Sequence, residues 1–149
     1  MTLRFIEAHP NSLERSCLLG HLTGSAWLVT PDRRSTVLLH HKKLNRWLQP
    51  GGHADGNGNL FEVALHEASE ETGLDLFIFI PVTNLIFDID VQKIPERGAE
   101  LAHTHYDIRY ISRSLKLIFG ATMNHTRYDL SQLMKSNNTI TPFLLRRWY

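Results

Sequence analysis

The chain has 149 residues, of which 42% are hydrophobic and 21% charged, and its formal net charge is +1. This length suits one domain, and a domain of this size buries enough surface to fold without a disulfide or a structural metal. The near-neutral charge excludes the broad basic field with which proteins bind nucleic-acid polymers irrespective of sequence. We therefore expect one globular domain over residues 1–149 and no nucleic-acid partner.

The N-terminal region predicts a protein of a reducing compartment. The first ten residues contain no long apolar run, so they predict neither a signal peptide nor a membrane span. Cys17 is the single cysteine and cannot close an internal disulfide, which indicates a cytoplasmic location. We interpret Cys17 as a small buried residue on a short helix over residues 11–22, which Asn11 would cap with Glu14 at the capping-box position.

The remaining chain alternates short β-rich runs with turns. Strands are predicted over residues 25–30, 36–40, 46–48 and 103–112, a bent pair of strands over 76–91, and a closing helix over 141–148. Between these elements, residues 53–58 predict a polar, glycine-rich loop that follows Gly51 and Gly52. Two consecutive glycines allow a ligand to approach the backbone closely.

A helix from Leu60 to Thr72 is predicted behind this loop. Asn59 can cap its N-terminus, Glu62 again occupies the capping-box position, and Gly73 is a natural terminator. The two ends therefore agree with the apolar periodicity between them.

Three glutamates of this helix share one side. At about 100° per residue, Glu67, Glu70 and Glu71 gather on one arc, where their like charges repel. A bound Mg²⁺ or Mn²⁺ would remove that repulsion, because hard cations prefer carboxylate oxygen. The alternative interpretation is a solvated acidic face. The glycine-rich loop favours the metal site, since it can bring a backbone carbonyl to the same ion.

Loop and helix together resemble the signature of the Nudix (MutT-like) hydrolases, Gly-x5-Glu-x7-Arg-Glu-apolar-x-Glu-Glu-x-Gly-apolar. The positions in register are Gly52, Glu67, Ala68, Glu70, Glu71, Gly73 and Leu74. Two positions depart, because Gly58 stands where the first glutamate belongs and His66 where the arginine belongs. The box over residues 52–74 is therefore degenerate. The resemblance implies an α/β fold, the Nudix-type α/β/α sandwich with a mixed β-sheet, in a single domain.

The resemblance also implies metal-dependent hydrolysis of a diphosphate linkage in a nucleoside diphosphate derivative or a related small molecule. Gly52 would offer its backbone carbonyl to Mg²⁺ or Mn²⁺, and Glu67 and Glu71 would bind the metal directly or through water. Glu70 would bind metal or position the attacking water, whose pKa the metal lowers. These three glutamates are the expected catalytic residues.

The departures from the signature imply a softer loop. In the family the two missing side chains brace the loop against the helix. We expect His66 to hydrogen-bond the loop instead, at Asp55 or Asn57, with activity reduced rather than abolished.

A row of ionisable side chains lies outside the box. His103, His105, Asp107 and Arg109 alternate along the predicted strand and so point to one face. His105, Asp107 and Arg109 are interpreted as substrate-binding residues for phosphate or base recognition, and the alternative is a solvated sheet face. His103 and His105 offer two ligands for Zn²⁺, but no third ligand stands at a standard spacing, so a separate zinc site is not predicted.

Other residues near the box have two interpretations each. His53 follows Gly52 and is a candidate contact for a substrate phosphate, or else an exposed loop histidine. Trp47 is interpreted as a core residue rather than a platform for a base. Glu96 and Glu100 are candidates for the further acidic residue that many family members carry as a metal ligand or base.

Two other functions were weighed against the hydrolase. A binding module that kept the fold and lost catalysis is favoured by Gly58, His66 and the unplaced base, whereas the three retained glutamates favour the enzyme. A nucleic-acid binder is supported only by Arg146 and Arg147 beside Trp148. The expected partner is a small diphosphate substrate, no membrane partner is expected, and a homodimer is compatible with the sequence.

Overall fold

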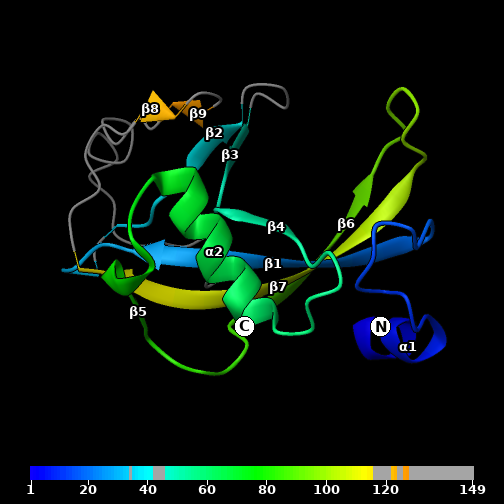
Figure 1. Ribbon diagram of the computed structural model, residues 1–149, viewed down its shortest axis with the longest axis horizontal. Coiled ribbons are helices and arrows are strands. Elements are labelled where there is room, and N and C mark those ends of the chain that lie inside the picture. The colour runs from blue at the N-terminus through cyan, green and yellow to red at the C-terminus, as the bar shows by residue number, and fades with distance from the viewer. Residues whose placement is uncertain (34, 42–45, 116–121, 124–125, 128–149) are drawn as a thin grey trace, which may run out of the picture.

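The computed structural model describes residues 1–33, 35–41, 46–115, 122–123 and 126–127. Its centre is a five-stranded sheet in which two long strands, β1 (Gly20–Val29) and β7 (His103–Ser114), run parallel to each other (Figure 1). The three shorter strands are β4 (Gly51–His53), antiparallel to β1, and β5 (Phe79–Pro81) and β6 (Asp88–Ile94), both antiparallel to β7. The sheet is therefore mixed, as predicted.

A smaller sheet lies beside the central one. Its strands follow the order β3 (Arg46–Leu48), β2 (Leu39–His41), β9 (Thr126–Arg127) and β8 (Thr122–Met123). The strand predicted over residues 46–48 is confirmed. The expectation that Trp47 belongs to the core is wrong: the residue is 38% exposed, and its ring lies against that of His40 with centroids 5.0 Å apart. β3 is an edge strand, so Trp47 packs on the surface of the small sheet.

One helix covers one face of the central sheet. α2 (Leu60–Thr72) has the predicted bounds and lies across β1 (Figure 1). Ala64 and Ala68 are fully buried against Ala26 and Leu28 of β1, which are also buried. Small side chains on both elements let the helix approach the sheet closely.

Glycine is required where α2 meets β1. A Cβ atom at Gly24 would lie 2.6 Å from the carbonyl oxygen of Leu60 and 3.3 Å from the backbone nitrogen of Ala64. The sheet therefore touches the backbone of the helix that carries the glutamates.

The helix expected over residues 11–22 is wrong. Helix α1 lies earlier, at Thr2–Ala8, and β1 already begins at Gly20. The intervening backbone forms separate turns, such as that in which Cys17 donates to Glu14, rather than a continuous helix. Its carbonyl at Leu13 accepts from Gly56. Leu13 and Gly56 are far apart in the sequence, so local capping signals could not reveal that contact. Cys17 is buried, as predicted.

Other elements also shift from their predicted bounds. His53 belongs to β4, so the loop begins at Ala54. The apolar stretch after α2 contains the 3₁₀ helix η1 (Leu76–Ile78) followed by β5 and β6. The helix predicted over residues 141–148, with Arg146 and Arg147, lies outside the described residues. Among the described helices, none has the length and apolar character that crossing a bilayer requires.

Candidate active site

The predicted glutamate-bearing helix forms with both predicted ends. The Asn59 side chain accepts the backbone N–H of Glu62 at 3.3 Å, and Gly73 ends the helix in the left-handed conformation with φ of 66°. Gly73 lacks a Cβ, so this conformation carries little strain. The caps define where the last turn falls, and Glu70 and Glu71 lie in that turn.

The glutamates of α2 face the paired glycines of β4. The backbone N–H of Gly51 donates to Oε2 of Glu71 at 3.1 Å. The Glu67 carboxylate occupies the space that a Cβ of Gly52 would fill. Glu67 and Glu71 are half-buried, whereas Glu70 is exposed. Glycine at both positions is what lets the carboxylates reach the backbone of β4.

The environment of these carboxylates disfavours their charged form. Burial raises the pKa of Glu71 to about 7; the N–H of Gly51 opposes this shift, and the charges of Glu67 and Glu70 add to it. Burial also raises the pKa of Glu67, with a further contribution from Glu70. A divalent cation would relieve both causes at once, because it replaces lost hydration and neutralises the mutual repulsion.

Among the side chains that the structure describes, no cation takes that role. Within the described residues, no Lys, Arg or His side chain forms an ion pair with Glu67, Glu70 or Glu71. Their oxygens are not already gathered into a tight set of donors, since the one such set found in the described part of the chain is made of histidines. The donor chemistry therefore fits Mg²⁺ or Mn²⁺, and binding would require the glutamate side chains to draw together.

The loop before α2 is held by a salt bridge outside the signature, in place of the pair lost at Gly58 and His66. His66 lies 4.0 Å from Glu62 on its own helix, so it does not hold the loop at Asp55 or Asn57 as expected. Asp55 is instead held by Arg15, through contacts of 2.6 and 2.7 Å. Arg15 was missed because it lies 40 residues earlier in the chain than its partner.

A hollow of about 180 Å³ lies on the face of the sheet opposite α2. Three predicted site residues, His53, His105 and Asp107, line it together with Gly51 and Gly52. The two glycines thus border the hollow and also contact the glutamates. This arrangement places the predicted metal ligands and three of the predicted substrate-binding residues around one short strand.

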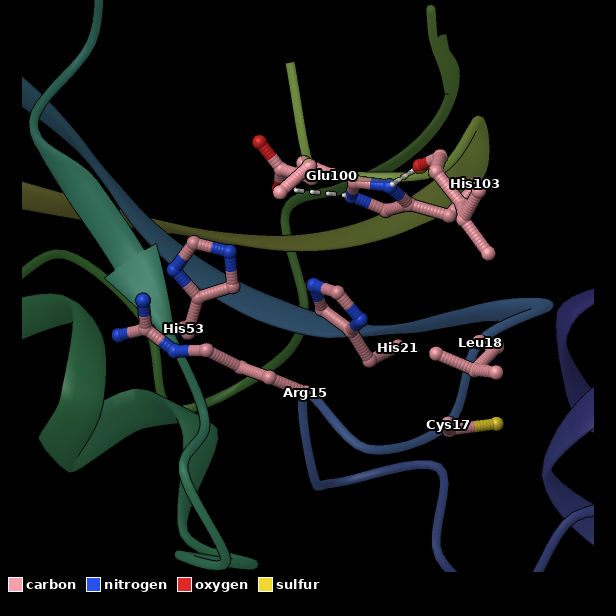
Figure 2. A pocket seen from close by; sticks show the side chains of 9 residues that line it. Arg15, Cys17, Leu18, His21, His53, Glu100 and His103 are labelled. Atoms are coloured by element: carbon pink, nitrogen blue, oxygen red, sulfur yellow. Dashed lines mark hydrogen bonds and ion pairs between the residues drawn. The ribbon is translucent and has the colours of Figure 1, made fainter. Parts of the chain in front are cut away.

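The histidines of this face lie close together. His53 is half-buried, and its ring lies beside that of His21 (Figure 2), with centroids 5.0 Å apart. The ring centroid of His105 is likewise 5.0 Å from that of His53. Burial lowers the pKa of His53 to about 4 and that of His105 to about 3, with further lowering by Arg15 and by neighbouring histidines. Both rings are therefore neutral near pH 7, and they would meet a phosphate as hydrogen-bond donors rather than as cations.

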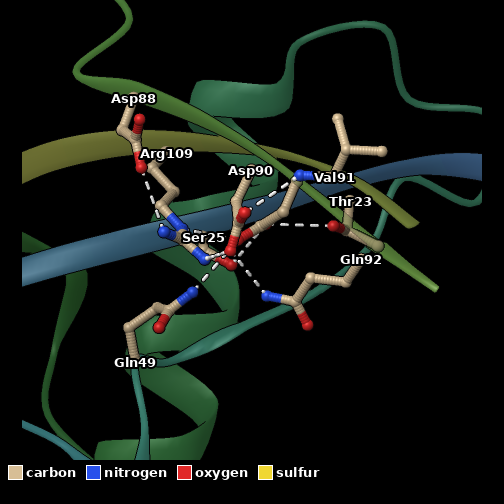
Figure 3. Close-up of polar contacts among 9 residues, drawn as sticks. Thr23, Ser25, Gln49, Asp88, Asp90, Val91, Gln92 and Arg109 are labelled. Carbon is tan, nitrogen blue, oxygen red and sulfur yellow. Dashed lines mark hydrogen bonds and ion pairs between the residues drawn. The ribbon is translucent and has the colours of Figure 1, made fainter. Parts of the chain in front are cut away.

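Asp107 is the buried centre of a polar network. It accepts hydrogen bonds from Thr23 at 3.0 Å, Ser25 at 2.6 Å, Gln49 at 3.0 Å and Arg109 at 2.8 Å (Figure 3). These donors come from β1, β7 and the segment before β4. The carboxylate thus fixes the floor of the hollow.

Arg109 is held by carboxylates. Its Nε contacts Asp107, its Nη1 contacts Asp88 at 3.0 Å and its Nη2 contacts Asp90 at 2.7 Å (Figure 3). All three nitrogens of the guanidinium are therefore engaged. The alternation of His103, His105, Asp107 and Arg109 on one face is confirmed, but the aspartates of β6 that neutralise Arg109 were not foreseen.

Glu96 and Glu100 lie in the connection between β6 and β7, and both are exposed. Oε1 of Glu100 is 3.7 Å from Nε2 of His103. No hydrogen bond or ion pair joins either glutamate to α2 within the described residues, so neither is identified as the missing base.

The sequence has no match among family models, and no curated protein matches it. Among solved structures, the chain is similar to a Nudix-family hydrolase from Clostridium perfringens, with 17% identity and a TM-score of 0.50 over 79% of this chain and 86% of that one. This likeness shows a Nudix-type α/β fold. The family's activity does not follow from the fold alone.

Two further structures are similar at lower scores. One is the Ap4A hydrolase of C. elegans, with 11% identity and a TM-score of 0.48 over 76% of this chain and 83% of that one. The other is the NUDIX domain of Shewanella oneidensis NrtR in complex with ADP ribose, with 17% identity and a TM-score of 0.42 over 76% of this chain and 75% of that one.

Proposed function

We propose that this single-domain protein is a Nudix-type pyrophosphohydrolase that cleaves a diphosphate linkage in a nucleoside diphosphate derivative or a related small molecule. The observation that carries the proposal is the placement of Glu67 and Glu71 against Gly52 and Gly51, with no cation of the described residues paired to them. Clustered carboxylates of raised pKa at a glycine-rich strand are the donor set that a hard divalent cation requires.

Each residue of the α2 site has a proposed role. Glu67, Glu71 and the backbone carbonyl of Gly52 would hold Mg²⁺ or Mn²⁺, and Glu70, the most exposed of the three carboxylates, would complete the site or orient the attacking water. When bound, the metal supplies charge neutralisation of the diphosphate and a lowered pKa for that water. The protein supplies the positioning, because capped α2 and paired β4 hold the ligands on regular elements.

The hollow beside β4 is the proposed substrate-binding site. His53 and His105 would donate hydrogen bonds to the substrate, and Asp107 would orient the Gln49 amide and the Ser25 hydroxyl at its floor. Arg109 is assigned a positioning role, since its nitrogens hold Asp107 and the β6 aspartates. Because the metal would balance the negative charge of the diphosphate, the neutral rings of His53 and His105 need only donate hydrogen bonds to it.

The test measures product release from a panel of nucleoside diphosphate derivatives with Mg²⁺ or Mn²⁺. Glu67→Gln and Glu70→Gln should each lower kcat/KM by at least 100-fold, about 2.7 kcal/mol of barrier. Glu7→Gln, at an exposed glutamate of α1, is the matched control and should leave the rate unchanged. Equal rates in wild type and both glutamine variants of α2 would reject the assignment.

A second candidate is a binding module without turnover. It is favoured by His66, which pairs along its own helix instead of bracing the loop. This candidate predicts metal-independent binding of a panel compound, measured by calorimetry, and no hydrolysis of any compound at any metal concentration. Turnover that depends on Glu67 and Glu70 would exclude it.

A further inference from the structure

Strand pairing brings together three histidines that are far apart in the sequence. β1 and β7 are parallel, with His21 opposite His105, and His103 lies two residues earlier on the same face of β7. The ring of His21 lies 4.9 Å from that of His103 and 4.8 Å from that of His105, measured between centroids. Figure 2 shows His21 between His53 and His103 at the edge of a cavity.

The nitrogen atoms of these rings converge. One ligand atom from each of His21, His103 and His105 lies within 4.8 Å of the other two. Nε2 of His103 and Nε2 of His105 are 3.0 Å apart. Ligand nitrogens on a tetrahedral Zn²⁺ are separated by ~3.3 Å, given Zn–N bonds of ~2.0–2.1 Å. The His103–His105 pair is already near this separation, and binding would require the nitrogen of His21 to draw toward it.

A backbone contact orients His103 as a ligand. Its Nδ1 lies 2.8 Å from the carbonyl oxygen of Leu101, which can only accept a hydrogen bond. Nδ1 therefore donates to this carbonyl, and Nε2 of His103 accepts a hydrogen bond from Nε2 of His105, whose proton a shared metal ion would displace. A carbonyl that holds the distal nitrogen in this way is the usual support of a metal-binding histidine.

His21 lacks partners for its polar atoms. It is 4% exposed, and neither Nδ1 nor Nε2 makes a hydrogen bond within the described residues. Burial lowers the pKa of His21, and a contact with the Cys17 backbone carbonyl, too weak to count as a full hydrogen bond, acts in the opposite direction. A buried polar group without a partner is costly, so an occupant that accepts its lone pair would stabilise the fold.

The residues around the histidine cluster have opposing effects on cation binding. His21 and His105 are held neutral by burial, as metal binding requires. Arg15 lines the adjoining cavity, and its positive charge disfavours a second cation, although its contact with Asp55 offsets that charge. Glu100, beside His103, adds negative charge at the same edge.

We propose that His21, His103 and His105 form a binding site for a divalent transition metal, Zn²⁺ in particular, distinct from the carboxylate site on α2. His105 also lines the hollow beside β4, so an ion on its Nε2 would leave only Nδ1 of that ring to donate to the proposed substrate. The adjoining cavity of about 200 Å³ gives the ion access from solvent. The fourth position is open to water or to Glu100, and His53 lines the same cavity. Imidazole donors select Zn²⁺ over Mg²⁺, so the two sites differ in the metal that they take.

The test measures Zn²⁺ binding to metal-stripped protein by competition with a chromogenic chelator. Co²⁺ serves as a second probe, because nitrogen ligands in tetrahedral geometry give it intense visible absorption. We expect one Zn²⁺ per chain in wild type, and at least 100-fold weaker binding in His103→Gln and in His105→Gln. His41→Gln, at an exposed histidine of β2, is the matched control and should bind as wild type does.

A further variant separates this site from the proposed hydrolase site. Glu67→Gln combined with Glu71→Gln should leave Zn²⁺ affinity and the Co²⁺ spectrum unchanged. Thermal unfolding without metal checks that the histidine variants fold, and added Zn²⁺ should raise the Tm of wild type but not theirs. The proposal is overturned if wild type binds no Zn²⁺, if the β7 variants bind it equally well, or if the glutamate variant loses it.

Discussion

Arg15 forms a bidentate salt bridge with Asp55, in which Nε donates to Oδ1 at 2.6 Å and Nη2 donates to Oδ2 at 2.7 Å. Asp55 lies in the loop between β4 and α2 and has a positive φ of 46°. The pair ties the N-terminal segment to this loop. It thereby supplies a brace that His66, turned toward Glu62, does not provide.

Arg15→Gln should loosen the loop more than it destabilises the fold. Both side chains of the pair are more than half exposed, so the free energy of unfolding should fall by no more than about 1 kcal/mol. The rate of diphosphate hydrolysis should fall about tenfold, because small misplacements of a site weaken catalysis. Urea denaturation and steady-state kinetics measure the two effects. Arg4→Gln, at an exposed arginine of α1, is the control, and a rate equal to wild type would argue against the brace.

Glu71→Gln should stabilise the metal-free protein at alkaline pH. In the folded protein the pKa of Glu71 is about 7, above its ordinary value of 4.5. The protonated carboxyl of Glu71 therefore stabilises the wild-type fold at low pH, and this stabilisation is lost as the pH rises from 4.5 through 7. Glutamine stays neutral throughout. The advantage of the variant should therefore grow from pH 4.5 to about 7 and then level at about 3 kcal/mol, since a difference of one in pKa is worth about 1.4 kcal/mol.

The measurement for Glu71→Gln is urea denaturation across this pH range in the presence of a chelator. Glu7→Gln, at an exposed glutamate of α1, is the control substitution. A variant that is less stable than wild type at pH 8 would contradict burial as the cause of the raised pKa.

Alanine at two glycines should have opposite consequences. At Gly52 the new Cβ meets the end of the flexible Glu67 side chain, so that carboxylate can move aside; the fold should be retained, and activity should fall at least tenfold. At Gly24 it meets the backbone of α2 at Leu60 and Ala64, which cannot move without separating helix and sheet. Gly24→Ala should cost about 1–3 kcal/mol of stability. Thermal unfolding and kinetics of the two variants distinguish these outcomes, and equal loss of stability in both would contradict the contacts.

Arg109→Gln should strongly destabilise the protein. The substitution leaves the carboxylates of Asp88, Asp90 and Asp107 close together without their shared cation. Removing one partner from a buried ionic network costs about 3–5 kcal/mol. Denaturation midpoints measure this loss. Arg113→Gln, on the same strand, is the comparison and should cost far less, because no ion pair joins Arg113 to another described residue.

Interactions between residues close in the sequence were enough to predict the bounds of α2 and the residues that share one face of β7. The cap at Asn59 and the terminator at Gly73 act within one turn of α2, so its bounds could be predicted. Strand alternation likewise sufficed to place His103, His105, Asp107 and Arg109 on one face. The prediction for residues 11–22 is wrong because the segment forms separate turns and pairs at Leu13 with the distant Gly56, which local capping signals do not encode.

The sequence by itself determined where α2 begins and ends and that three of its glutamates share an arc, because capping and helical periodicity act over a few residues. Tertiary structure alone decided which groups meet across strands and loops: Gly51 with Glu71, Arg15 with Asp55, and His21 with the histidines of β7. Such contacts depend on the register of paired strands and on which distant segments pack together, and short-range sequence patterns do not specify either.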